Sequence, residues 1–94
     1  MVTVLVTVKI PVALLQYVGN RTELIVDADN VEELLRHLDA RFPDLSAFII
    51  NEKHELRRYV NVFVNEEDVR LGNGLTTQLK EGDRVSIVPI VAGG

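Results

Sequence analysis

The sequence predicts an α+β domain in which one main helix packs on one face of a mixed sheet of four to five strands. Apolar and polar residues alternate near both ends of the chain, helical spacing appears once between them, and turn residues separate these segments. The chain has 94 residues, which is the usual size of one domain. We therefore expect residues 1–94 to form a single domain that ends in a flexible tail at 90–94.

A first strand is predicted over residues 2–10, where valine and isoleucine at even positions form one face and Leu5 lies on the other. Pro11 ends this run, and Gly19-Asn20 is a turn signal. Residues 21–27 then predict a second strand. Consecutive strands joined by a short connection favour an antiparallel hairpin.

The main helix is predicted from residue 31 to residue 42. Asn30 is a good N-cap, Glu33 can complete a capping box, and Pro43 is expected to stop the helix. The apolar residues with helical spacing are Val31, Leu34, Leu35, Leu38 and Phe42. This stripe is expected to pack on the sheet.

The second half of the chain begins with a less regular stretch at 44–58, in which Leu45, Phe48 and Ile49 fit one helical turn. Alternation returns at 59–65 and at 84–90, so each of these runs predicts a strand. Turns are expected at 66–68, 72–74 and 81–83.

The first and last strands are the most apolar, so we expect them to lie side by side and parallel at the centre of the sheet. With the helix across one face, the order of elements predicts the β-grasp arrangement of ubiquitin-like domains.

Composition excludes several functions. The net charge of −4 disfavours nucleic-acid binding, and the only adjacent basic pair is Arg57-Arg58. An acidic protein of this kind suits a partner with a basic docking face. The absence of cysteine excludes disulfides, thiolate metal sites and a thiol nucleophile. No signal peptide and no membrane-spanning run is evident, so we expect a cytoplasmic protein that does not enter a membrane.

Two blocks of sequence resemble a known family. Residues 58–70 read Arg-Tyr-Val-Asn-Val-Phe-Val-Asn-Glu-Glu-Asp-Val-Arg, and residues 81–89 read Glu-Gly-Asp-Arg-Val-Ser-Ile-Val-Pro before Val91-Ala92-Gly93-Gly94. They are similar to blocks of the ThiS/MoaD-like sulfur carriers, which have a ubiquitin-like fold. The resemblance is closest to the type that serves cysteine biosynthesis. The molybdopterin synthase small subunit and the thiamine-pathway carrier remain alternatives.

This resemblance implies that the working group is the C-terminal carboxylate of Gly94. An E1-like enzyme would adenylate it with ATP and Mg²⁺ held by that enzyme, and sulfur would then convert it to a thiocarboxylate. A sulfur-accepting synthase would take the sulfur, and a metalloprotease that trims or releases the C-terminus is a further partner. The chain itself would bind no cofactor and would be a protein cosubstrate, not an enzyme.

The tail and one sheet face are the candidate sites. Glycine has no side chain, so Val91, Ala92 and Gly93 are expected to thread into a narrow partner active site. The outer sheet face is expected to form an apolar docking patch, because large exposed apolar residues mark interfaces. Its predicted members are Phe63, Val88, Ile90 and Leu5.

Several alternatives stay open at this point. The segment after the helix could cover the docking patch, and the small residues at the end could be an ordinary frayed terminus. The protein could be a modifier joined to lysines on targets, a non-covalent β-grasp binding module, or a permanent subunit of a larger synthase. His37 and His54 are predicted to be isolated surface residues, so no metal site is expected.

Overall fold

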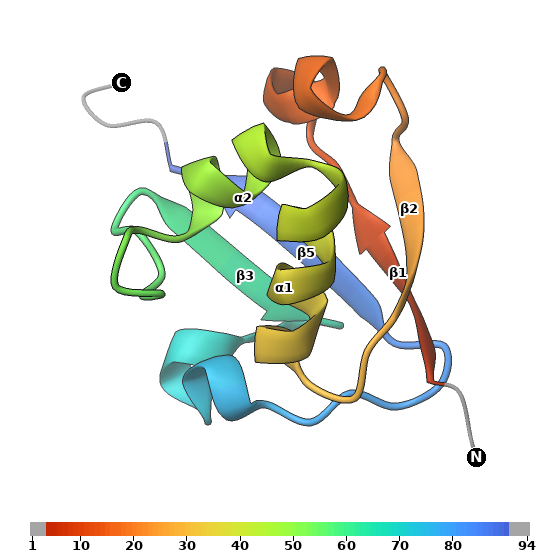
Figure 1. Cartoon of the computed structure of the whole chain (residues 1–94). Helices are drawn as coiled ribbons and strands as arrows, with labels where there is room; N and C mark the ends of the chain where they lie inside the picture. Colours follow the sequence, from red (N-terminus) through yellow and green to blue (C-terminus); the bar gives the residue numbers. More distant parts are fainter. Residues whose placement is uncertain (1–3, 91–94) are drawn as a thin grey trace.

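The computed structural model describes residues 4–90, which form a mixed sheet with helices on one side of it (Figure 1). The strands are β1 (Leu5–Lys9), β2 (Glu23–Asp27), β3 (Val60–Val64), β4 (Glu67–Asp68) and β5 (Arg84–Pro89). The α-helices are α1 (Val31–Arg41) and α2 (Pro43–Ile49). Three short 3₁₀ helices are η1 (Val12–Val18), η2 (Val69–Leu71) and η3 (Gly74–Thr76). None of these helices is long and apolar enough to cross a bilayer.

The strand order β2-β1-β5-β3-β4 places the first and last strands together at the centre. β1 and β5 are parallel, with Val8 opposite Val85, whereas β2 pairs with β1 and β3 pairs with β5 in the antiparallel direction. The predicted hairpin and the predicted central parallel pair are both confirmed. The inner face of both strands lies against the helices, and neighbouring strands flank both their edges.

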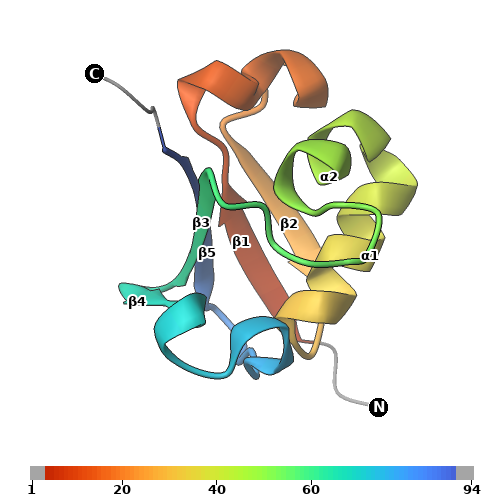
Figure 2. The same cartoon turned by 90° about the vertical axis from the view of Figure 1, so that its left-hand side faces the viewer.

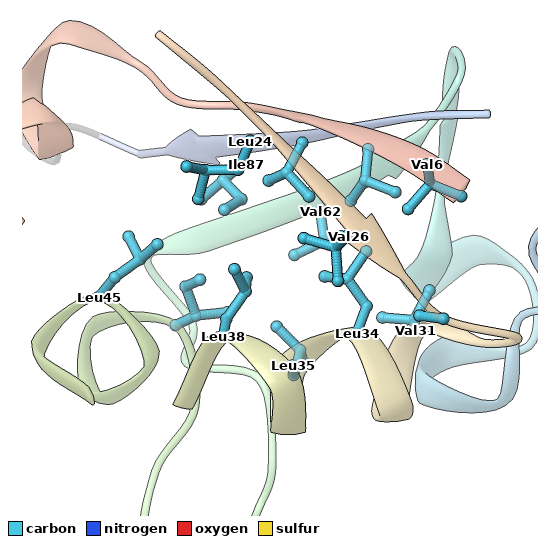
Figure 3. Close-up of a cluster of buried hydrophobic side chains, with 14 of the residues drawn as sticks. Val6, Leu24, Val26, Val31, Leu34, Leu35, Leu38, Leu45, Val62 and Ile87 are labelled. Carbon is cyan, nitrogen blue, oxygen red and sulfur yellow. The ribbon is translucent and has the colours of Figure 1, made fainter. Parts of the chain in front are cut away.

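Helix α1 begins where the sequence predicts it. The Asn30 side chain accepts a hydrogen bond from the Glu33 backbone N–H at 2.8 Å, which satisfies one of the free amides of the first turn. The Glu33 carboxylate accepts from the Asp29 N–H at 3.3 Å, one residue before the cap. The buried side chains of α1, Leu34 and Leu38 among them, point toward the sheet and form the core with it (Figure 3).

Pro43 does more than end the main helix. It occupies the first turn of α2, where its missing N–H has no helical partner to lose. Leu45 and Ile49 are buried, and the half-buried Phe48 ring contacts the Tyr59 ring edge-on at 5.4 Å between centroids. Figure 2 shows α2 on the same side of the sheet as α1. The segment after α1 therefore does not cover the outer face, and that alternative is excluded.

Two local expectations were wrong. The connection between β1 and β2 is not short, because it folds into η1, which buries Leu14 and Val18 and ends at Gly19 with a φ of 63°. Residues 66–68 are not only a turn: Glu67–Asp68 pair with β3 as β4. Asn65 and Glu66 make the two-residue turn, in which Asn65 has a positive φ of 59°.

Candidate functional site

The root of the predicted tail is the end of β5. The backbone N–H of Ile90 donates to the carbonyl oxygen of Tyr59 at 2.6 Å, so the last described residue is held against the start of β3. Val91, Ala92, Gly93 and Gly94, the predicted threading and working residues, lie outside the described residues. The structure thus fixes where the tail starts, beside the segment that precedes β3 (Figure 1).

The outer sheet face beside this root carries apolar side chains. Val85 and Ile87 are buried, while Val88 is 41% exposed and Ile90 is 45% exposed, as the predicted alternation requires. Phe63 is half-buried on the same face. Phe63 lies opposite Ser86, and Asn61 lies opposite Val88, so Phe63 and Val88 are diagonal neighbours across two paired strands. The structure therefore brings Phe63, Val88 and Ile90 into one patch.

Leu5 does not belong to that patch. It is 42% exposed on the outer side, but its carbonyl accepts from the Gly82 N–H, before β5 begins, whereas Ile90 follows the end of β5. Arg84 and Ser86 of β5 lie between these two ends. Because β1 and β5 are parallel, the first residue of β1 is at the end of the sheet remote from the tail. The expectation that Leu5 extends the patch is corrected by this register.

Tyr59 was not among the predicted docking residues, yet it lies at the tail root. Its side chain is 43% exposed and its carbonyl holds Ile90. The alternation at 59–65 predicts that Tyr59 shares a face with Phe63, but its ring contacts the Phe48 ring of α2, on the helix side of the sheet. Antiparallel register with β5 brings its carbonyl to Ile90. We call Phe63, Val88 and Ile90 the tail-root patch.

Away from the tail root, part of the outer face is polar. Lys9 and Glu23 form an ion pair between β1 and β2. The hydrogen bond and charge of Lys9 hold the pKa of the Glu23 carboxyl below its usual value. His37 and His54 are both exposed, and residues 4–90 contain no group of three or more side chains suited to hold a metal ion.

A groove of about 1020 Å³ is lined by Glu66, Asn73 and Asp83 among others. Asp83 comes just before β5, whereas the tail follows the end of that strand. The groove therefore lies away from the tail root and is not part of the tail site.

The chain has a mixed sheet with parallel central strands, a capped helix on one face, and an apolar patch at the root of a diglycine tail. Together these features define a ubiquitin-like carrier of the β-grasp fold. The model of the ThiS family matches residues 8–94, and the chain belongs to the ThiS family.

The chain is similar to a sulfur carrier protein, CysO, of Mycobacterium tuberculosis, with 36% identity over 91 residues that cover 95% of this chain and 98% of the relative. It is 41% identical to small archaeal modifier protein 3 of Haloferax volcanii over 70 residues, 73% of this chain and 75% of that one. The crystal structure of the Amycolatopsis orientalis BexX/CysO complex contains a chain with 37% identity and a TM-score of 0.87, at 95% and 99% coverage. These relatives confirm the predicted fold and the predicted resemblance to sulfur carriers.

Proposed function

We propose that this protein is a sulfur carrier whose working group is the carboxylate of Gly94, and that it serves cysteine biosynthesis. The observation that carries the proposal is the family match, which runs through Gly94 and so includes the diglycine. The CysO relatives favour the cysteine pathway over molybdopterin or thiamine synthesis. A molybdopterin converting factor of Pyrococcus furiosus shares only 24% identity, which supports the fold alone.

The proposed chemistry begins with activation, because a carboxylate is a poor electrophile. An E1-like enzyme joins one oxygen of the Gly94 carboxylate to the α-phosphorus of ATP, and pyrophosphate leaves. Mg²⁺ on that enzyme offsets the phosphate charge. Sulfide then attacks the carbonyl carbon, the bond to the AMP oxygen breaks, and AMP leaves with the electron pair. A thiocarboxylate results, and no oxidation or reduction takes place, because the sulfur stays at the sulfide level throughout.

The contribution of the chain itself is to position its C-terminal tail for the partner enzyme. Ile90 is fixed to Tyr59 by a backbone hydrogen bond, so the body holds the start of the tail in one direction. Small residues at Ala92, Gly93 and Gly94 suit a narrow channel in the partner. The tail-root patch would dock on the same enzyme, and a sulfur-accepting synthase and a trimming metalloprotease complete the set of partners. The protein is a cosubstrate in each of these steps.

We also propose a cytoplasmic location. The activation consumes ATP, and a chain without cysteine needs no oxidising compartment for its stability.

The test is an intact-mass measurement after incubation with a cognate activating enzyme, ATP, Mg²⁺ and sulfide. We expect a gain equal to replacement of one oxygen by sulfur, and no gain in a matched protein that lacks Gly94. An unchanged mass, with an enzyme active on another carrier, would contradict the proposal. It would favour a non-covalent binding module, which should also tolerate an extra C-terminal residue.

A second candidate function is that of a protein modifier. It is favoured by the similarity to small archaeal modifier protein 3. A modifier also starts from the adenylate, but a lysine amine on a target then takes the place of sulfide. High-mass conjugates in cell extract, absent when Gly94 is deleted, would support it. Coelution with one large partner would instead indicate a permanent synthase subunit.

A further inference from the structure

Three arginines gather at the root of the tail. Arg57 and Arg58 immediately precede Tyr59, whose carbonyl oxygen accepts from the Ile90 N–H at 2.6 Å. Arg58 is exposed. The third, Arg70, comes from η2 on the far side of the β3–β4 turn, and its guanidinium returns to the start of β3.

Hydrogen bonds to neutral oxygens hold two of the three in place. The Arg70 Nη1 donates to the Asn61 side-chain oxygen at 2.8 Å, and its Nη2 donates to the Arg57 backbone carbonyl. The Arg57 Nε donates to the carbonyl of Ala47 at 2.8 Å. Within residues 4–90 the ion pairs join Lys9 to Glu23 and Arg36 to Glu32, so neither includes these arginines.

This arrangement concentrates positive charge in a protein whose net charge is −4. Fixing a long arginine side chain costs conformational entropy, and like charges repel each other. Both effects lower the free energy of unfolding of the domain. Within residues 4–90 no carboxylate forms an ion pair with these guanidinium groups, although the Asp68 side chain accepts from the Arg70 backbone N–H at 2.9 Å. A partner carboxylate would offset that cost, because a guanidinium matches a carboxylate in a bidentate pair.

We propose that Arg57, Arg58 and Arg70 form a basic cluster that docks on an acidic surface of the activating enzyme, beside the channel that receives the tail. This inference rests on the proposed function and names the chemistry of its docking surface. The cluster borders the tail-root patch, so apolar contacts lie at the centre and charges at the rim, as in other interfaces. The net charge alone predicts a basic partner face, and the local charge at the tail root reverses that prediction.

Rim charges act chiefly on the rate of encounter, which falls as salt screens them. The experiment compares Arg58→Glu with Lys80→Glu, which makes the same change in net charge just before β5, at the other end of that strand. Pyrophosphate release by the activating enzyme is followed against carrier concentration at low and high salt. We expect Arg58→Glu to lower kcat/KM about tenfold at low salt and much less at high salt, with kcat unchanged.

Lys80→Glu should stay within about twofold of the wild type, and Arg58→Lys should retain most of the activity because it keeps the charge. Equal values for Arg58→Glu and Lys80→Glu, with the wild type activated, would overturn the basic cluster and leave the sulfur-carrier proposal standing. A wild type that a competent enzyme fails to activate would overturn both. Because Arg58 is exposed and outside the core, a thermal melt should show both glutamate variants folded.

Discussion

The two faces of the sheet come from the same strands but differ in what covers them. On the inner face, Val8, Val62 and Val85 lie under α1 and are fully buried. On the outer face, the alternate residues of those strands are polar or only partly buried, and the helices do not cover them (Figure 2). The inner face therefore sets the stability of the domain, whereas outer residues contribute little to it and are available for recognition. Substitutions at alternate positions should separate these two roles.

The largest effect is expected on the inner side. Leu38→Asp, on α1, places a carboxylate among side chains that have no polar partner to offer, at a position with no exposed surface. Leucine burial alone contributes roughly 1.5–3 kcal/mol, and the unpaired charge adds several more, so the domain should unfold. Circular dichroism and urea titration measure this. Leu34→Asp should unfold in the same way. Val88→Asp, the control on the outer face, should fold. A cooperative unfolding transition in Leu38→Asp near that of the wild type would contradict the comparison between the two faces.

The outer face should show the opposite behaviour. Phe63→Ala removes a half-buried ring, so we expect a loss of about 1 kcal/mol in the free energy of unfolding and a folded protein. Its activation by the E1-like enzyme should slow several-fold, because a central apolar anchor is lost. Ile25→Ala is the matched control, since Ile25 is exposed on the outer side of β2, opposite Thr7 and away from the tail. Equal activation of the folded Phe63→Ala protein and the wild type would remove the patch from the proposal.

The N-cap of α1 stabilises the helix that covers the inner face. Removing the cap should have an intermediate effect on the free energy of unfolding and no effect on activation. Asn30→Ala leaves the Glu33 N–H without its side-chain acceptor, at an expected cost of about 1 kcal/mol. Asn30→Asp keeps an acceptor and should lose less. Thermal melts of both variants measure the difference. Activation should equal that of the wild type at temperatures where both are folded, and a selective loss of activation would mean that Asn30 also contacts a partner.

The periodic segments were predicted correctly because burial on one side repeats along them. Val60, Val62 and Val64 all face the core, and Leu34 with Leu38 do the same at helical spacing, so each pattern has a single interpretation. The local caps at Asn30 and Pro43 were visible too, although Pro43 also begins α2.

The irregular parts could not be derived in this way. In η1 only Leu14 and Val18 are buried, and two buried residues in seven give no distinct period. Membership of the tail-root patch depends on register between distant strands, which is why Leu5 was included wrongly. The hydrogen bond from Arg70 to the Arg57 carbonyl depends on the conformation of a turn and a 3₁₀ helix between the two residues. No local sequence pattern predicts this contact.

The smallest effect is expected from the ion pair between Lys9 and Glu23, whose side chains are both about half exposed. Lys9 lowers the pKa of Glu23 in the folded protein, so the pair stabilises the fold above the unfolded pKa of this carboxyl, and that stability is lost as pH falls through the folded pKa. Glu23→Gln should thus be slightly less stable than the wild type at pH 7, and the difference should vanish in acid. Urea titrations at both pH values measure it. A difference that persists in acid would show that Glu23 acts through packing, and the polar part of the outer face would then contribute to stability in the way that the inner face does.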